Sequence, residues 1–184
     1  GCGRCVSACP EGVHELAAGR HRLRREACRA CGRCVGECFA GALELVGRWL
    51  DVEQVLEQVV ADLPYYRRSG GGVTVSGGEP LLQRAFVGQL LAACRARGVA
   101  TAIETAGNYP WAWLAAVLEH VDLVMYDVKV LDPVAHGRHV GNDGRRSRAN
   151  LLRLARTGKP LIVRTPVVGG VNDTRQHIEA IARL

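Results

Sequence analysis

The sequence predicts an α/β fold with a parallel sheet, preceded by a small cysteine-rich domain. Three features predict it: short β-branched runs alternate with helical patterns, seven of the eight cysteines lie within the first 38 residues, and the 22 glycines concentrate at turns between apolar runs. Such alternation is typical of parallel sheets, whose strands are connected by helices. We expect the domain boundary after residue 48, with residues 49–184 forming the α/β part.

Composition indicates a globular protein. Hydrophobic residues make up 48% of the chain and the mean hydropathy is +0.02, which excludes wholesale disorder. No apolar run reaches the roughly 18 residues of a membrane span, so we expect a soluble protein with no membrane partner. The net charge of +6 comes without aromatic residues among the arginines, so we expect no nucleic-acid partner. Because Gly1 stands where a start methionine is usual, we interpret the chain as a fragment.

The cysteine-rich segment contains one motif twice, 29 positions apart. The second copy is a complete C-x2-C-x2-C-x3-C run, the ferredoxin spacing for [4Fe-4S] clusters, in which three close cysteines hold one cluster and the fourth crosses to the other. Thiolates suit iron–sulfur cores, so two clusters are predicted. One would take Cys9, Cys28, Cys31 and Cys34; the other would take Cys2, Cys5 and Cys38 with a cysteine upstream of this chain.

Two other interpretations of these cysteines fit the sequence less well. A disulfide framework is typical of small secreted proteins, whereas most of this chain is an ordinary α/β core. A paired zinc site prefers two separated CxxC pairs to four cysteines in one run. The cysteine outside this segment, Cys94, lies in an amphipathic helical pattern and is expected to be a small buried hydrophobe.

The α/β part has a predicted order of elements. Helices are expected over 51–62, 81–97, 111–120, 147–156 and 173–184, and strands over 73–75, 99–103, 123–128 and 161–167. In the second helix Leu82, Phe86, Leu90 and Cys94 would share one face, and Gly98 would end it.

Polar residues recur where each predicted strand ends. They are Glu79, Glu104 with Thr105, Asp127 with Lys129, and Arg164 with Thr165. In barrel-type α/β proteins this rim is where ligands bind. A strand also places residues two apart on one face, as with Met125, Asp127 and Lys129. Carboxylates and a lysine converging on one rim predict a site for a zwitterionic ligand.

The turn from Ser76 to Pro80, downstream of the two-cluster segment, resembles that of the activating enzymes of glycyl-radical enzymes, within the radical S-adenosylmethionine (SAM) superfamily. The segments 103–105, 126–129, 163–167 and 172–173 match the same family, so the resemblance runs from end to end. It implies a partial (β/α) barrel of the radical SAM type over 49–184, truncated at both ends, with a dicluster ferredoxin-like insert over 1–48.

The resemblance also implies a cofactor site. The Gly-Gly-Glu turn, here Gly77, Gly78 and Glu79, would receive the ammonium group of SAM, and glycine backbone with a carboxylate suits a cation. The segment containing Asp127, Val128 and Lys129 would contact the cofactor, with Lys129 at its carboxylate. Arg164 belongs to a further matching segment. Glu104, Thr105, Asp127 and the Met125 carbonyl resemble a monovalent-cation site, although Glu104 stands where pyruvate formate-lyase activase has Asp.

No CxxxCxxC loop for a catalytic cluster occurs in this chain, and family order would place it before Gly1, so no catalytic residue is assigned. By resemblance, the intact enzyme takes an electron from flavodoxin or ferredoxin, cleaves SAM, and abstracts hydrogen from a glycine of a partner glycyl-radical enzyme. Oxygen-sensitive clusters indicate a cytoplasmic, anaerobic setting. The alternatives are a dicluster electron-transfer protein fused to an α/β ligand-binding domain, and a radical SAM enzyme that acts on a small molecule.

Overall fold

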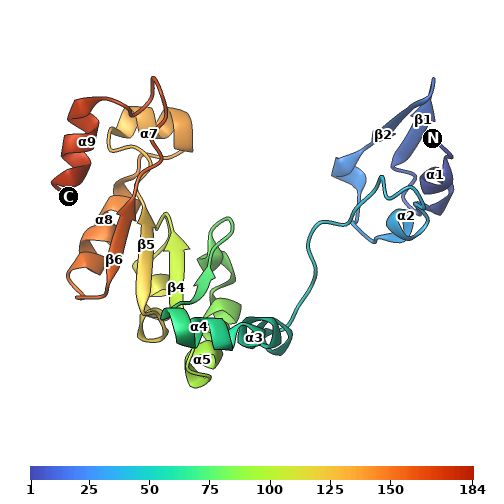
Figure 1. Ribbon diagram of the computed structural model, residues 1–184. Helices are drawn as coiled ribbons and strands as arrows, with labels where there is room; N and C mark the ends of the chain where they lie inside the picture. Colours follow the sequence, from blue (N-terminus) through green and yellow to red (C-terminus); the bar gives the residue numbers. More distant parts are fainter. The chain divides into compact units, whose positions relative to one another are not determined.

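The computed structural model describes residues 1–184, which form two compact units, Gly1–Leu50 and Asp51–Leu184 (Figure 1). The first unit is built from two short helices and a hairpin of two antiparallel strands. Its elements are α1 (Arg4–Ala8), β1 (His14–Ala17), β2 (Arg20–Leu23), the 3-10 turn η1 (Arg25–Ala27) and α2 (Arg33–Gly36).

The sequence repeat of the first unit reappears as a structural repeat. Helix α1 follows Gly3, and α2 follows Gly32 at the equivalent position of the second copy. Both glycines have left-handed backbones, with φ of 76° and 77°. Glycine adopts this conformation without the steric cost that other residues bear. The two copies therefore begin their cysteine-bearing helices in the same way.

The second unit confirms the predicted α/β fold. Its four strands form one parallel sheet in the order β3-β4-β5-β6. The strands are β3 (Gly72–Val75), β4 (Ala100–Thr105), β5 (Leu123–Asp127) and β6 (Leu161–Arg164). The helices are α3 (Val52–Ala61), α4 (Leu63–Ser69), α5 (Arg84–Ala96), α6 (Trp111–Ala115), α7 (Pro133–Val140), α8 (Arg145–Ala155) and α9 (Arg175–Ala182), with the 3-10 turns η2 (Pro80–Gln83) and η3 (Leu118–His120).

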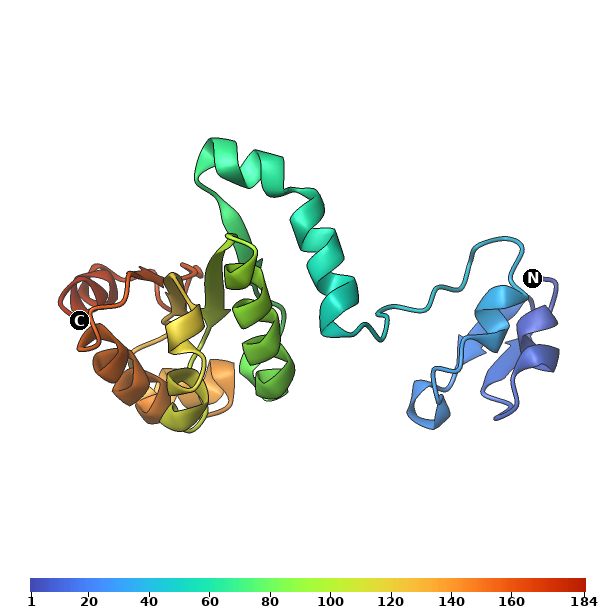
Figure 2. The same ribbon diagram turned by 90° about the horizontal axis from the view of Figure 1, so that it is seen from below.

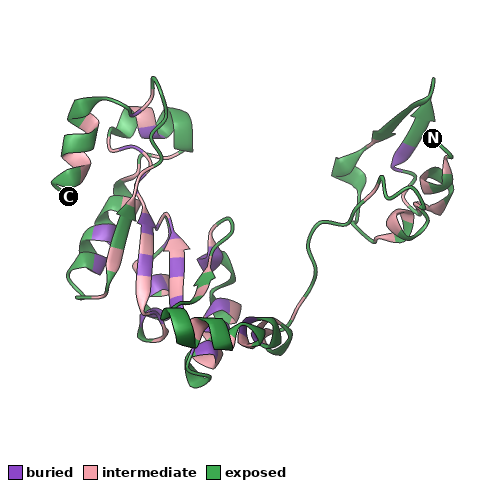
Figure 3. Ribbon diagram, viewed as in Figure 1, coloured by how far each residue is buried: buried purple, intermediate pink, exposed green.

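The connecting helices α5, α6 and α8 lie along one face of this sheet (Figure 2). The core forms there, where Ile103 and Val124 of the central strands pack with Leu91 of α5, Leu114 of α6 and Leu154 of α8. Each of these five side chains has a relative exposure of 0%. Residues on β4 and β5 alternate between buried and partly exposed (Figure 3). The other face of the sheet thus keeps its polar side chains accessible.

Two predicted helices differ in detail. The helix expected from Leu81 begins with the 3-10 turn η2, and α5 starts only at Arg84. This turn changes which side chain is buried: Leu81 is 0% exposed, whereas Leu82, expected on the apolar face, is 68% exposed. The helix expected over 111–120 is interrupted after Ala115 and ends as η3.

Other boundaries have local causes. Helix α3 begins after Asp51, as predicted, because the Asp51 carboxylate accepts a hydrogen bond from the Gln54 amide at 2.8 Å and completes a capping box. Strand β6 ends at Arg164 and not at Val167, shortly before Pro166, which has no backbone N–H to continue a ladder. Helices α4 and α7 were not predicted. No helix has the length and apolar character that a membrane crossing requires.

Asn172 holds together the loops that follow β5 and β6. Its side-chain amide donates to the carbonyls of Lys129 and Pro166, both at 2.8 Å, and accepts from the Val168 amide at 2.7 Å. Asn172 is only 2% exposed.

Replacement of Asn172 by Ala would leave buried backbone groups without a hydrogen-bond partner, so we expect the free energy of unfolding to fall by about 3 kcal/mol. Urea denaturation measures this, with the exposed Asn108→Ala as a control that should change little; equal effects would contradict this role.

Candidate functional site

The carboxyl ends of the parallel strands bring the predicted polar residues together. In the sheet register, Glu104 of β4 lies opposite Met125 of β5, and Asp127 of β5 lies opposite Arg164 of β6. Glu104, Met125, Asp127 and Arg164 are all partly exposed, on the face that the connecting helices leave open. The alternation of β5 therefore places its site residues away from the core, as predicted.

These side chains form one charged network, here called the rim network: Ser76, Glu104, Asp127, Lys129 and Arg164. Arg164 bridges the two carboxylates, bonding Glu104 and donating to Oδ1 of Asp127 from Nη2 at 3.0 Å. Lys129 donates from Nζ to Oδ2 of Asp127 at 2.7 Å. The Ser76 hydroxyl donates to Glu104 at 3.3 Å and links the glycine turn to the network.

Asp127 is the centre of the rim network, and its side chain is 14% exposed. Burial opposes its ionisation, but the hydrogen bonds from Lys129 and Arg164 outweigh burial and hold the pKa of this carboxyl below its usual value. The hydrogen bonds that Arg164 donates to Glu104 and Asp127 raise the pKa of Arg164. The Asp127 carboxylate and the Arg164 guanidinium are thus ionised at neutral pH.

Glu79 lies at the same edge of the sheet but bonds to different partners. Its carboxylate accepts from the Thr105 hydroxyl at 2.8 Å and, at 3.3 Å, from the backbone amides of Leu81 and Ala106. The Thr105 oxygen is also 2.9 Å from the Tyr109 hydroxyl. Burial raises the pKa of Tyr109, so this phenol stays protonated. These contacts fix the Glu79 carboxylate next to the glycine turn.

The glycine turn itself is exposed. Gly77 has φ of +125°, a backbone conformation that disfavours other residues, and a Cβ at Gly77 or Gly78 would meet no atom within 4 Å. The open space beside both residues leaves the peptide groups of the turn free to face a ligand. A cationic group would find carbonyl oxygens and the Glu79 carboxylate within one turn.

The first unit gathers four thiols around a cavity. Cys9, Cys28, Cys31 and Cys34 line a cavity of about 230 Å³. Burial raises the pKa of Cys34, and the thiols of Cys28, Cys31 and Cys9 add to the shift. None of the eight cysteines is in a disulfide. Four thiols that line one cavity match the donor set of an iron–sulfur cluster, so the residues fit that group.

The remaining cysteines differ in their surroundings. Cys2 is exposed, and Cys5 and Cys38 are partly exposed. Cys5 lies near two histidines of the hairpin, His14 and His21, which the sequence prediction did not include. Cys94 is 0% exposed in the second unit and packs with Leu56 and Val99, as predicted for a small hydrophobe.

Among the sequence-predicted cofactor residues, the structure joins Glu104, Asp127, Lys129 and Arg164 directly. Gly77, Gly78 and Glu79 form the adjoining turn, and the side chain of Val128 packs into the core with 8% exposure. Sequence reasoning missed Tyr109 as a support of Thr105, because it lies in a loop without periodicity. The sequence also did not indicate that Asn172 joins the loops after β5 and β6, although the segment 172–173 matches the family.

Comparison with known proteins gives a family match. The profile of the Radical SAM superfamily matches residues 26–184. The chain is 39% identical over 183 residues to the (2S)-3-sulfopropanediol dehydratase activating enzyme of Klebsiella oxytoca, covering 98% of this chain and 58% of that protein. It is 40% identical to the choline trimethylamine-lyase activating enzyme of Oleidesulfovibrio alaskensis, covering 98% and 59%. The benzylsuccinate synthase activating enzyme of Thauera aromatica is also 40% identical, with 99% and 57% covered.

A solved structure is similar as well. A domain of the pyruvate-formate lyase-activating enzyme from Bacteroides vulgatus superposes with a TM-score of 0.58 at 29% identity, covering 61% of this chain and 70% of that one. The chain spans less than two thirds of the length of the curated relatives named above, 57% to 59%.

Proposed function

Because the chain belongs to the radical SAM superfamily, we propose that it forms the SAM-binding part of an enzyme that installs a glycyl radical on a partner enzyme. The relatives named above are activating enzymes of this kind. The observation that carries the proposal is the rim network beside the Gly77–Gly78–Glu79 turn, which offers both signs of charge at one edge of the sheet.

The methionyl end of SAM carries an ammonium and a carboxylate, and the site offers a partner for each. The ammonium would lie at the glycine turn, where the fixed Glu79 carboxylate supplies the opposite charge. The carboxylate would lie at Lys129, whose side chain is 37% exposed. An ammonium group has three donors and Asp127 uses one of them, so Lys129 retains donors for a ligand.

Asp127 would contribute to SAM binding indirectly, by orienting Lys129. Its two oxygens accept from Lys129 on one side and Arg164 on the other, so the carboxylate orients both cations at the end of β5. We include Val128 as a backbone contact, because its side chain is in the core. A monovalent cation at Glu104 and Asp127 would compete with Arg164, which forms ion pairs with both carboxylates in this structure.

When bound, SAM and a catalytic iron–sulfur cluster would supply the radical chemistry, and the protein would supply placement and exclusion of side reactions. We assign Cys9, Cys28, Cys31 and Cys34 to one [4Fe-4S] cluster, and Cys2, Cys5 and Cys38 to a second. These clusters would relay electrons from a flavodoxin or ferredoxin. Oxygen-sensitive thiolate sites of this kind suit a reducing cytoplasm.

The test is an anaerobic assay of the protein that carries this chain, loaded with iron and sulfide and mixed with dithionite, SAM and a glycyl-radical enzyme from the same genome. We expect 5′-deoxyadenosine by chromatography and a glycyl-radical doublet by electron paramagnetic resonance. Fully iron-loaded protein that forms no 5′-deoxyadenosine would contradict the proposal. Product without the doublet would instead favour a small-molecule substrate.

A further inference from the structure

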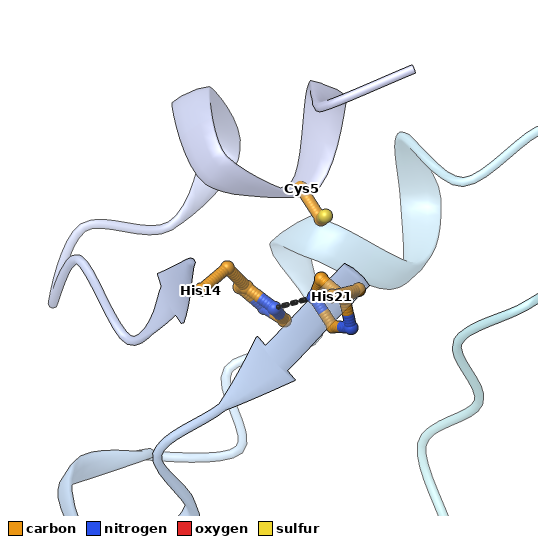
Figure 4. Close-up of side chains that lie close together, drawn as sticks. All are labelled: Cys5, His14 and His21. Carbon is orange, nitrogen blue, oxygen red and sulfur yellow. Dashed lines mark hydrogen bonds between the residues drawn. The ribbon is translucent and has the colours of Figure 1, made fainter. Parts of the chain in front are cut away.

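The hairpin of the first unit carries a histidine pair next to a cysteine. His14 of β1 and His21 of β2 are joined by a hydrogen bond of 2.8 Å between Nδ1 of His14 and Nε2 of His21 (Figure 4). Their rings stack with centroids 5.0 Å apart. A ring nitrogen of each histidine and the Sγ of Cys5 all lie within 4.8 Å of one another.

The hydrogen bonds of His14 are incomplete. A neutral imidazole has one N–H and one bare nitrogen, and the bond to His21 uses Nδ1. The other nitrogen, Nε2, is buried and has no hydrogen-bond partner. His14 is only 3% exposed, so water does not supply one freely.

The tautomer of His14 depends on which of the two rings donates in this bond. When His21 donates from Nε2, His14 accepts at Nδ1 and carries its hydrogen on Nε2. That hydrogen then needs an acceptor inside the unit. The nearby acceptors are sulfurs: His14 is near Cys5, and it also lines the cavity of Cys9, Cys28, Cys31 and Cys34.

Sulfur that carries a net negative charge accepts N–H hydrogen bonds. Such bonds stabilise the reduced form of an iron–sulfur cluster more than the oxidised form, because the reduced form is more negative. A buried imidazole N–H beside sulfur is therefore able to raise a reduction potential, whereas an aliphatic side chain of similar volume is not.

We propose that His14, with its tautomer fixed by His21, donates its second N–H to sulfur of the cluster that Cys5 would hold and raises the reduction potential of that cluster. This inference rests on the proposed function only for the presence of a cluster at Cys5. His14 is the donor, and His21 is a positioning residue that acts through it.

The test is a redox titration of the chain after anaerobic reconstitution with iron, sulfide and excess 2-mercaptoethanol, whose thiolate fills any iron position that the cysteines leave open. Electron paramagnetic resonance follows each cluster, and the signal that Cys5→Ser removes or alters is assigned to the Cys5 site. We expect His14→Leu to shift the midpoint potential of this signal to a more negative value. His14→Gln retains an N–H donor and should restore most of the parent value.

Two further variants separate tuning from general damage. His21→Leu should shift the same potential in the same direction as His14→Leu, because the tautomer is no longer fixed. His139→Leu, at an exposed histidine of the second unit, should leave it unchanged. A loaded cluster whose potential is the same in His14→Leu and the parent overturns this inference alone. Reconstituted protein in which Cys5→Ser alters no cluster signal overturns it together with the cluster assignment.

Discussion

Replacement of Lys129 by Met is expected to weaken SAM binding to this protein by about 10- to 100-fold, the effect of losing one hydrogen bond between charged groups. Lys129 lies at the rim, bound to Asp127 at 2.7 Å, with donors left for a ligand carboxylate. Methionine keeps much of the side-chain length without the charge. Isothermal titration calorimetry with SAM measures the change directly.

The chain offers a matched control for this variant. Its other lysine, Lys159, precedes β6 and donates to the Val121 carbonyl at 2.8 Å, at the opposite end of the strands. Lys159→Met should leave the SAM dissociation constant unchanged, even where it lowers stability. Equal affinity in the two variants would remove Lys129 from the binding site.

The second large effect is expected from Gly107→Ala. Gly107 follows β4 with φ of +69°, and a Cβ there would overlap the hydroxyl and ring of Tyr126. The Tyr126 hydroxyl donates to the Ser147 carbonyl at 2.7 Å, and burial raises its pKa to about 12, so the ring is anchored and protonated. We expect the free energy of unfolding to fall by about 3 kcal/mol or more, measured by urea denaturation.

Gly158→Ala measures the cost of the left-handed backbone conformation without a steric overlap. Gly158 has nearly the same φ, +70°, but a Cβ there meets nothing within 4 Å. This variant should lose only about 1 kcal/mol, the cost of a left-handed conformation in a residue with a side chain. Comparable losses in both glycine variants would show that the contact with Tyr126 has little importance.

The sheet was predictable because parallel strands covered by helices have a recognisable pattern of short apolar runs in the sequence. The runs at 99–103 and 123–128 are rich in β-branched residues and coincide with β4 and β5 within about two residues. The rim was predictable for the same reason: strands that run parallel end at one edge, so Glu104, Asp127 and Arg164 meet once the strands are placed in order.

Features that depend on tertiary contacts were not predictable. The hydrogen bond that Thr105 donates to Glu79 joins residues 26 positions apart, and no local pattern indicates it. The exposure of Leu82 follows from the 3-10 turn over Pro80–Gln83, whereas helical periodicity alone places Leu82 inside. The His14–His21 pair depends on the hairpin register, which a polar, arginine-rich segment specifies weakly.

The central claim is that the rim of the sheet binds the amino acid end of SAM. A crystal structure of the iron-loaded protein with SAM tests this most directly. We predict the SAM ammonium at the Gly77–Gly78–Glu79 turn and the SAM carboxylate within hydrogen-bond distance of Lys129. SAM bound away from both, with the rim network unchanged, would contradict the account.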